Sequence, residues 1–143
     1  MLLGLYSAVS RRNLTALRMG PAYPGPDCDN DALRAFRQTL LEQPDHAAGG
    51  ELKVSRDFFT TSNFRDLVLH VSERAVTIPE IANFLSEHGL LFRGFQLTSD
   101  AFALFEERFP GASWPGDLGQ WADFEEEHPC LFNGMYTFWC CTA

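Results

Sequence analysis

Three segments of the chain carry the hydrophobic pattern of β-strands. Met1–Ser7 (MLLGLYS) is a continuous apolar run of strand length, which is typical of a strand buried on both faces. Leu91–Leu97 and Gly134–Cys141 (GMYTFWCC) each follow a helical segment and have the same strand length. We therefore expect a small mixed sheet of three strands.

Between these strands, apolar residues recur three and four positions apart, as they do on one face of a helix. The clearest helix start is Thr77-Ile-Pro-Glu80, a capping box with proline in the first turn. The expected helices are Ala8–Arg18, a helix capped by Asp29 or Asn30 that ends before Pro44, a helix capped by Ser62 or Asn63, a helix from Thr77 to Gly89, Asp100–Phe109, and a helix capped by Asp117 that ends before Pro129. Asp45–Glu51 reads as a flexible connection.

Strands and helices in this order predict an α/β (or α+β) fold, which we expect to form three layers. The chain has 143 residues, a length typical of one domain with its own core, so we expect a single domain over residues 1–143. Its net charge of −8 argues against nucleic acid or an anionic membrane as a partner. No apolar run approaches the ~20 residues that a membrane-spanning helix needs.

The cysteines and the first residues bear on the compartment. Cys28, Cys130, Cys140 and Cys141 show no CxxC spacing, and adjacent Cys140 and Cys141 would point to opposite faces of a strand. The basic residues near the start follow the apolar run, the reverse of a secretory leader. We expect a cytoplasmic protein with reduced thiols.

The run Thr77–Leu97 (TIPEIANFLSEHGLLFRGFQL) is a capped helix, a glycine stop and then a strand. It resembles the carboxyl-terminal part of class I S-adenosylmethionine-dependent methyltransferases, in which such a helix leads into the sixth strand. LLGLYS is similar to their fifth strand, and GMYTFWCC to their closing antiparallel strand. More narrowly, SRDFF, RDLVLHV and FEEEHPCLFNGMYTFW resemble the tail of the methyltransferases that are fused to tetratricopeptide repeats. Phe64 departs from that pattern, in which a cysteine precedes the Arg-Asp pair.

The resemblance covers nearly the whole chain and implies a strand order. The last strand would lie between the other two and antiparallel to both. The Met1–Ser7 strand would have a further neighbour in the parent sheet, which suggests that the part of the sheet preceding it is missing from this chain. That missing part holds the cofactor, on a glycine-rich turn after a strand with an acidic residue on the ribose. No such turn follows a strand here, so we expect no cofactor and no S-adenosylmethionine binding, which weighs against an enzyme.

Five residues are candidates for a ligand cleft. Tyr6 and Ser7 end the first strand, where open α/β sheets place their ligands. Arg56 and Arg65 either form ion pairs with their neighbouring aspartates or line the cleft. His70 lies three residues before a glutamate, a spacing that gives either a hydrogen-bonded pair or part of a site. No catalytic residue is identified.

Other residues that could carry chemistry receive structural interpretations. A metal ion needs a third convergent ligand beside His70 and Glu73, and the spacing supplies none, so no metal site is expected. Glu125–Glu127 is interpreted as the solvated side of a helix, like the acidic residues within Phe105–Arg108. The cysteines are interpreted as packing residues, because no cationic neighbour in sequence would lower their pKa.

These observations favour a non-catalytic remnant of a methyltransferase that acts as an oligomeric interaction module. A strand that has lost its neighbour leaves an apolar edge that invites pairing with another chain. We therefore expect a homodimer through the Met1–Ser7 edge or the adjacent apolar face, with a protein partner as a further possibility. The alternatives are a small enzyme or ligand-binding protein with a cleft near Tyr6, Arg65 and His70, and a subunit that completes a split methyltransferase.

Overall fold

The chain folds into two compact units, each of which is described by itself. The computed structural model describes residues 1–44, 50–70, 73–112, 117–132 and 134–142. One unit comprises Met1–Arg11 and Arg74–Ala143 and contains the sheet, so we call it the sheet unit; the other, Arg12–Glu73, is the helical unit. The expectation of a single domain stays a prediction beside this division.

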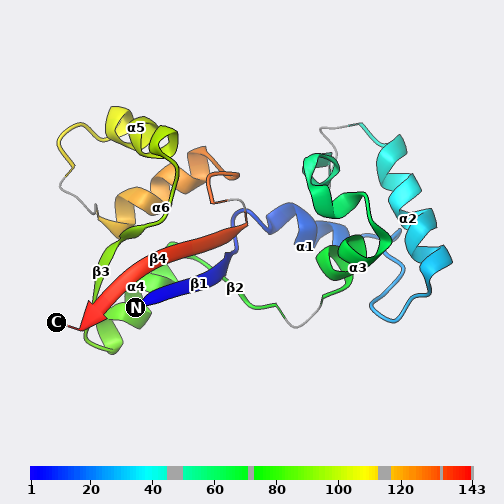
Figure 1. The fold of residues 1–143 in the computed structure, drawn as a ribbon, viewed down its shortest axis with the longest axis horizontal. Coiled ribbons are helices and arrows are strands. Elements are labelled where there is room, and N and C mark those ends of the chain that lie inside the picture. Colours follow the sequence, from blue (N-terminus) through cyan, green and yellow to red (C-terminus); the bar gives the residue numbers. More distant parts are fainter. Residues whose placement is uncertain (45–49, 71–72, 113–116, 133, 143) are drawn as a thin grey trace. The chain divides into compact units, whose positions relative to one another are not determined.

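The sheet unit contains a mixed sheet of four strands in the order β2-β1-β4-β3 (Figure 1). Its elements are β1 (Leu2–Ser7), β2 (Ala75–Val76), α4 (Ile78–Glu87), β3 (Leu90–Phe95), α5 (Ser99–Arg108), α6 (Leu118–Glu127) and β4 (Met135–Thr142). β4 lies between β1 and β3 and is antiparallel to both, which confirms the α/β class and the central place of the last strand. β2 is an additional strand that the sequence did not predict, and it pairs with β1 in parallel over two residues.

One face of this sheet is covered by the helices of its own unit. Strict alternation along β4 buries Tyr136, Phe138 and Cys140 on the inner face. Leu3 and Leu5 of β1 pack against the same core. The helices α4, α5 and α6 contribute to it through Ile78, Ile81, Leu85, Phe105, Trp121 and Phe124. Within the described part of this unit the layers are therefore two, and the expectation of three layers is wrong there.

β1 corrects a second expectation. The continuous apolar run Met1–Ser7 predicted a strand buried on both faces, but Leu2 is 44% exposed and Gly4 is also exposed. Leu3, between them, points to the core instead. The reason is that the helices pack on one side only, so alternate positions of β1 remain at the surface whatever their hydrophobicity.

The caps explain where the helices of the sheet unit begin. The Thr77 hydroxyl accepts a hydrogen bond from the Glu80 amide, and the Glu80 carboxylate accepts one from the Thr77 amide, which confirms the capping box of α4. The Thr77 amide and the Thr77 hydroxyl both donate hydrogen bonds to the Glu80 carboxylate, and these two bonds lower the pKa of Glu80. Asp117 caps α6 as expected. α5 begins one residue earlier than expected because Thr98 caps it.

The helical unit contains α1 (Arg12–Met19), α2 (Asn30–Glu42), the short 3-10 helices η1 (Gly50–Val54) and η2 (Arg56–Phe58), and α3 (Thr61–Leu69). Asp29 caps α2 as expected, whereas α3 is capped by Thr60 and not by Ser62 or Asn63. Leu33, Phe36, Phe58, Phe64 and Val68 are members of a second buried core. The predicted connection at 45–49 lies outside the described residues. Among the described residues, no helix has the length and apolar character to cross a bilayer.

The two cores predict that the units unfold in separate steps. Leu33→Ala in the helical core, where Leu33 is 0% exposed, should cost that unit about 2–5 kcal/mol. The sequence range of the sheet unit holds all three tryptophans of the chain, and the helical unit's range holds none, so we use tryptophan emission to follow the sheet unit. We expect Leu33→Ala to lower the thermal transition seen by far-ultraviolet circular dichroism and to leave the emission transition in place.

The matched control is Leu85→Ala, whose side chain is 3% exposed in the core of the sheet unit and which should move the emission transition. Equal shifts of both signals in both variants would mean one cooperative domain, as the single-domain prediction requires.

Candidate functional site

The carboxyl end of β1 is the point where open α/β sheets place ligands, and here it is a buried hydrogen-bonded junction. Ser7 is 0% exposed, and its amide donates to the carbonyl of Gly134 over 3.0 Å. Its hydroxyl donates to Glu125 Oε1 over 2.6 Å and accepts from the Ser10 amide over 2.9 Å. The Ser7 carbonyl accepts from the Arg11 amide. Ser7 therefore holds the start of the turn that leads out of the sheet.

Glu125 is the centre of this junction. It lies on α6 four residues after Trp121, so both side chains project from the same buried side of the helix. Its Oε2 accepts a hydrogen bond from the phenol of Tyr136 over 2.7 Å. Tyr136 comes from the inner face of β4, so α6, β1 and β4 each contribute one member. We call Ser7, Glu125 and Tyr136 the buried polar triad.

Burial governs the chemistry of this triad. Glu125 is 1% exposed, and a carboxylate removed from water is tolerated only when hydrogen bonds replace its hydration. Burial raises the pKa of Tyr136 far above its ordinary value, and the hydrogen bond to Glu125 adds to the shift. The phenol therefore stays protonated at neutral pH, and it remains a donor to Glu125.

The triad contains a hydroxyl beside a carboxylate, but its geometry is that of a structural hydrogen-bond network. A nucleophilic serine must be reached by a substrate and activated by a general base, which is usually histidine. Ser7 has no exposed surface, and its oxygen already engages Glu125 and Ser10. The triad therefore stabilises the meeting of β1, α6 and β4.

Tyr6, the other candidate in the sheet unit, lies on the opposite face of β1. The guanidinium of Arg11 stands over its ring, 4.2 Å from the centroid, a cation–π contact. On that face Tyr6 is the cross-strand neighbour of Met135. Tyr6 therefore belongs to the surface of the sheet, and Ser7 to its interior.

The remaining three candidates belong to the helical unit. Arg65 donates to the carbonyl of Cys28 and to Asn30 Oδ1, both over 3.0 Å, and so fixes the segment that leads into α2. His70 Nδ1 lies 3.7 Å from Glu73 Oε1, too far for a hydrogen bond, and α3 ends before His70, so the two do not share a helical face. Arg56 begins η2 and is exposed. A common cleft of these three with Tyr6 stays a prediction, since Tyr6 belongs to the other unit.

Two of the triad's residues were not among the sequence candidates. Glu125 was interpreted with Glu126 and Glu127 as solvated, and that interpretation is wrong for Glu125. The sequence signal that Glu125 is buried was its position four residues after the apolar Trp121, which places both on one side of the helix. No group of three or more histidine, cysteine, aspartate or glutamate side chains in the described ranges could hold a metal ion. The four cysteines are unpaired thiols.

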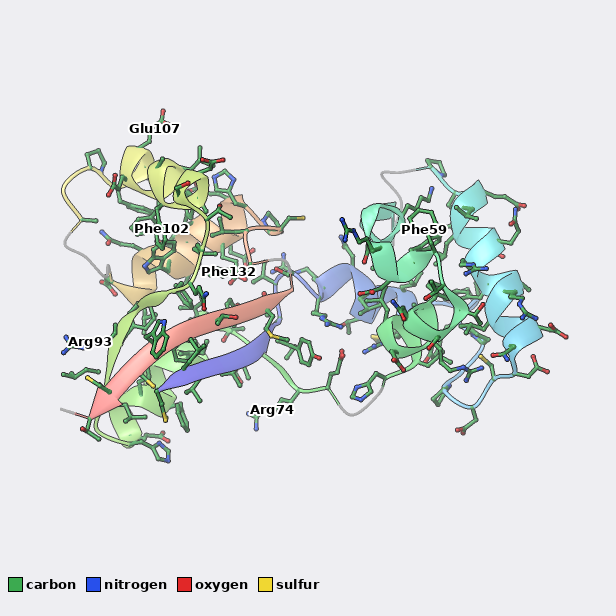
Figure 2. All side chains as sticks on the ribbon, in the orientation of Figure 1. Phe59, Arg74, Arg93, Phe102, Glu107 and Phe132 are labelled. Atoms are coloured by element: carbon green, nitrogen blue, oxygen red, sulfur yellow. The ribbon has the colours of Figure 1, made fainter. Side chains whose placement is uncertain are left out.

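The second candidate surface is the face of the sheet that the unit's helices leave uncovered, which we call the outer face. Leu2, Leu91, Met135 and Trp139 are 41–51% exposed on it. The strand residues of this face are Leu2, Gly4 and Tyr6 of β1, Leu91 and Arg93 of β3, and Met135, Thr137, Trp139 and Cys141 of β4. Arg93, labelled in Figure 2, donates to the Cys141 sulfur over 3.2 Å. The strands place no carboxylate on this face.

Comparison with known families finds no family model that matches this chain, and comparison with curated proteins finds no match either.

The triad makes a prediction about stability. Glu125→Ala would leave the hydroxyls of Ser7 and Tyr136 buried without their acceptor, and each such group costs about 1–3 kcal/mol. We expect the free energy of unfolding of the sheet unit, followed by tryptophan emission in urea, to fall by about 3 kcal/mol or more. Asp123→Ala, an exposed position on the same helix, should change it by less than about 0.5 kcal/mol. Equal effects of the two variants would contradict a stabilising role for the triad.

Proposed function

We propose that the chain is a non-catalytic, methyltransferase-derived interaction module that works as a homodimer through its sheet. The observation that carries the proposal is the outer face, where large apolar side chains lie exposed on three adjacent strands. The non-catalytic part of the proposal is supported by the Ser7 hydroxyl at the end of β1, which is buried and donates its hydrogen bond to Glu125 within the buried polar triad.

The strand order supports a methyltransferase origin. The resemblance implied a last strand placed between the other two and antiparallel to both, and β4 has that place between β1 and β3. The sequence offers no glycine-rich turn after a strand to cradle a cofactor. A protein with part of a fold and without its binding elements can keep the architecture while losing the activity.

The character of the outer face supports self-association. Exposed Leu2, Leu91 and Trp139 form the kind of contiguous apolar surface that marks an association site. Two copies with a net charge of −8 each repel one another, and that repulsion is smallest where the surfaces in contact carry no carboxylates. The outer face meets that condition, since its charged strand residue is Arg93 and Arg11 stands over Tyr6 beside it.

The proposal predicts that S-adenosylmethionine does not bind. Isothermal titration of the chain with S-adenosylmethionine should give only heats of dilution, because the residues that hold this cofactor in the resembled family have no counterpart here. Binding at micromolar concentration would overturn the non-catalytic part of the proposal. Binding only after a second chain is added would favour a subunit of a split methyltransferase.

The proposal also predicts that a charge on the outer face separates the copies. Leu2→Lys should give a folded monomer in sedimentation equilibrium at micromolar concentration, where the unchanged chain is a dimer, because Leu2 lies on the outer face at the β1 edge and a lysine there resists desolvation by a second copy. Leu2 is already 44% exposed, so the monomer should keep its circular dichroism spectrum. Leu41→Lys is the matched control: Leu41 is 47% exposed on α2 and should leave the dimer intact. A stable monomer of the unchanged chain would refute self-association.

A further inference from the structure

The ladder between β1 and β4 shows which backbone groups of β1 face away from its partner. Met1 exchanges hydrogen bonds with Cys140, and the Ser7 amide donates to Gly134. In an antiparallel pair, residues alternate between those bonded to the partner and those whose groups point to the other side. Odd-numbered residues of β1 are therefore bonded to β4, and the amides and carbonyls of Leu2, Gly4 and Tyr6 point to the free side.

β2 covers only the end of that free side. It pairs with Tyr6 and Ser7, and its Val76 carbonyl accepts from the Ala8 amide. Among the described residues no strand pairs with β1 alongside Leu2 and Gly4. Two amides and two carbonyls are thus left in a row on an edge whose strand, LLGLYS, contains neither proline nor a charged side chain.

The opposite edge of the sheet is protected in ways that β1 is not. β3 has an irregularity in its register between Phe92 and Gly94, and the residue between them is Arg93. Bulges and charged side chains are the devices by which edge strands avoid pairing with other chains. The β3 edge is therefore protected against pairing with another chain, whereas the β1 side of the sheet is open alongside Leu2 and Gly4.

We propose that the open edge of β1 pairs antiparallel with β1 of a second copy, with Leu2 of each copy opposite Gly4 of the other. This inference rests on the homodimer proposed above and places its contact at the β1 edge of the outer face, so that the outer faces of the two copies lie side by side in one joined sheet. A two-fold axis then passes beside Leu3, and the four open backbone groups of each copy meet four of the other. The two sheets become one continuous sheet of eight strands, since each copy contributes four.

Other registers use the open edge less well. If Gly4 lay opposite its own copy, Leu2 would face Tyr6, whose free side β2 already occupies. If Leu2 lay opposite Leu2 of the other copy, Gly4 would lie opposite a position outside β1, which begins at Leu2, and its amide and carbonyl would have no strand partner. A long parallel neighbour, as in the parent sheet, would also meet β2 at Tyr6 and Ser7. The short antiparallel pairing avoids that collision.

The side chains suit the proposed register. On the outer face, exposed Leu2 comes to lie beside Gly4, which has no side chain to oppose close approach. Thr137 and Trp139 flank these positions on β4. On the inner face, Leu3 of each copy faces Leu3 of the other, next to the cores against which both already pack. The contact therefore extends the apolar surface on both sides of the joined sheet.

The register is tested by disulfide formation. Directly opposed residues without mutual hydrogen bonds have Cα atoms about 4.5 Å apart, within the span of a disulfide. Leu3→Cys, in a background where Cys28, Cys130 and Cys141 are serine, should oxidise largely to a covalent dimer on non-reducing electrophoresis. Leu5→Cys lies on the same face and is the matched control; it faces Met1 of the other copy and should stay monomeric under the same oxidant.

The outcomes separate the register from the dimer. If the unchanged chain is a dimer but Leu3→Cys does not cross-link more than Leu5→Cys, the register is overturned and the homodimer stands. If the unchanged chain is a monomer, both fall. Should Leu3→Cys lose its circular dichroism spectrum, a mixture of Leu2→Cys and Gly4→Cys chains replaces it. The register requires a mixed disulfide between these two variants and excludes a disulfide between two Gly4→Cys chains as the main product.

Discussion

The buried carboxyl of Glu125 is the constraint on which the sheet unit depends. Its two oxygens accept hydrogen bonds from Ser7 at the end of β1 and from Tyr136 in β4, so one side chain of α6 fixes two strands. Ser7 and Glu125 are 118 positions apart in the chain. A carboxyl this deeply buried is destabilising unless both oxygens are occupied, so β1, α6 and β4 can assume this arrangement only together.

The junction also determines where the chain leaves the sheet. Ser7 is the last residue of β1, and the helical unit begins within a few residues of it. The chain returns at β2, which pairs with the same end of β1. The segment between β1 and β2 is long, and bringing its two ends together costs entropy. Contacts at the point where the chain leaves β1 must offset part of that cost. The hydrogen bonds around Ser7 provide such contacts.

The elements predicted well from sequence are those whose signals are local. Alternation in β4, the Asp29 and Asp117 caps and the Thr77 capping box depend on a few neighbouring residues. The cap of α3 was misplaced because Thr60 begins a run of four polar residues, any of which could serve. β2 has two residues, too few for any period, and exists only because β1 lies beside it.

The candidate site was less predictable, for a related reason. Glu125 sits in a run of three glutamates, and only its helical spacing from Trp121 sets it apart. Its partners come from the two ends of the chain, and no local pattern reveals such a meeting. Likewise, Tyr6 and Arg65 belong to different units, and the sequence does not mark that division.

What the chain presents to other molecules follows from its one-sided packing. Because α4, α5 and α6 gather on the inner face, the apolar residues that alternate outward from β1, β3 and β4 have no cover within the sheet unit as described. An unguarded strand edge adjoins that surface, and a bulge bearing an arginine guards the opposite edge. In the sheet unit the Ser7 hydroxyl and the Glu125 carboxyl are buried, whereas Leu2, Leu91 and Trp139 are exposed. The asymmetry of the sheet thus leaves apolar side chains and open backbone hydrogen-bonding groups at its surface, and these are the features on which the proposed self-association rests.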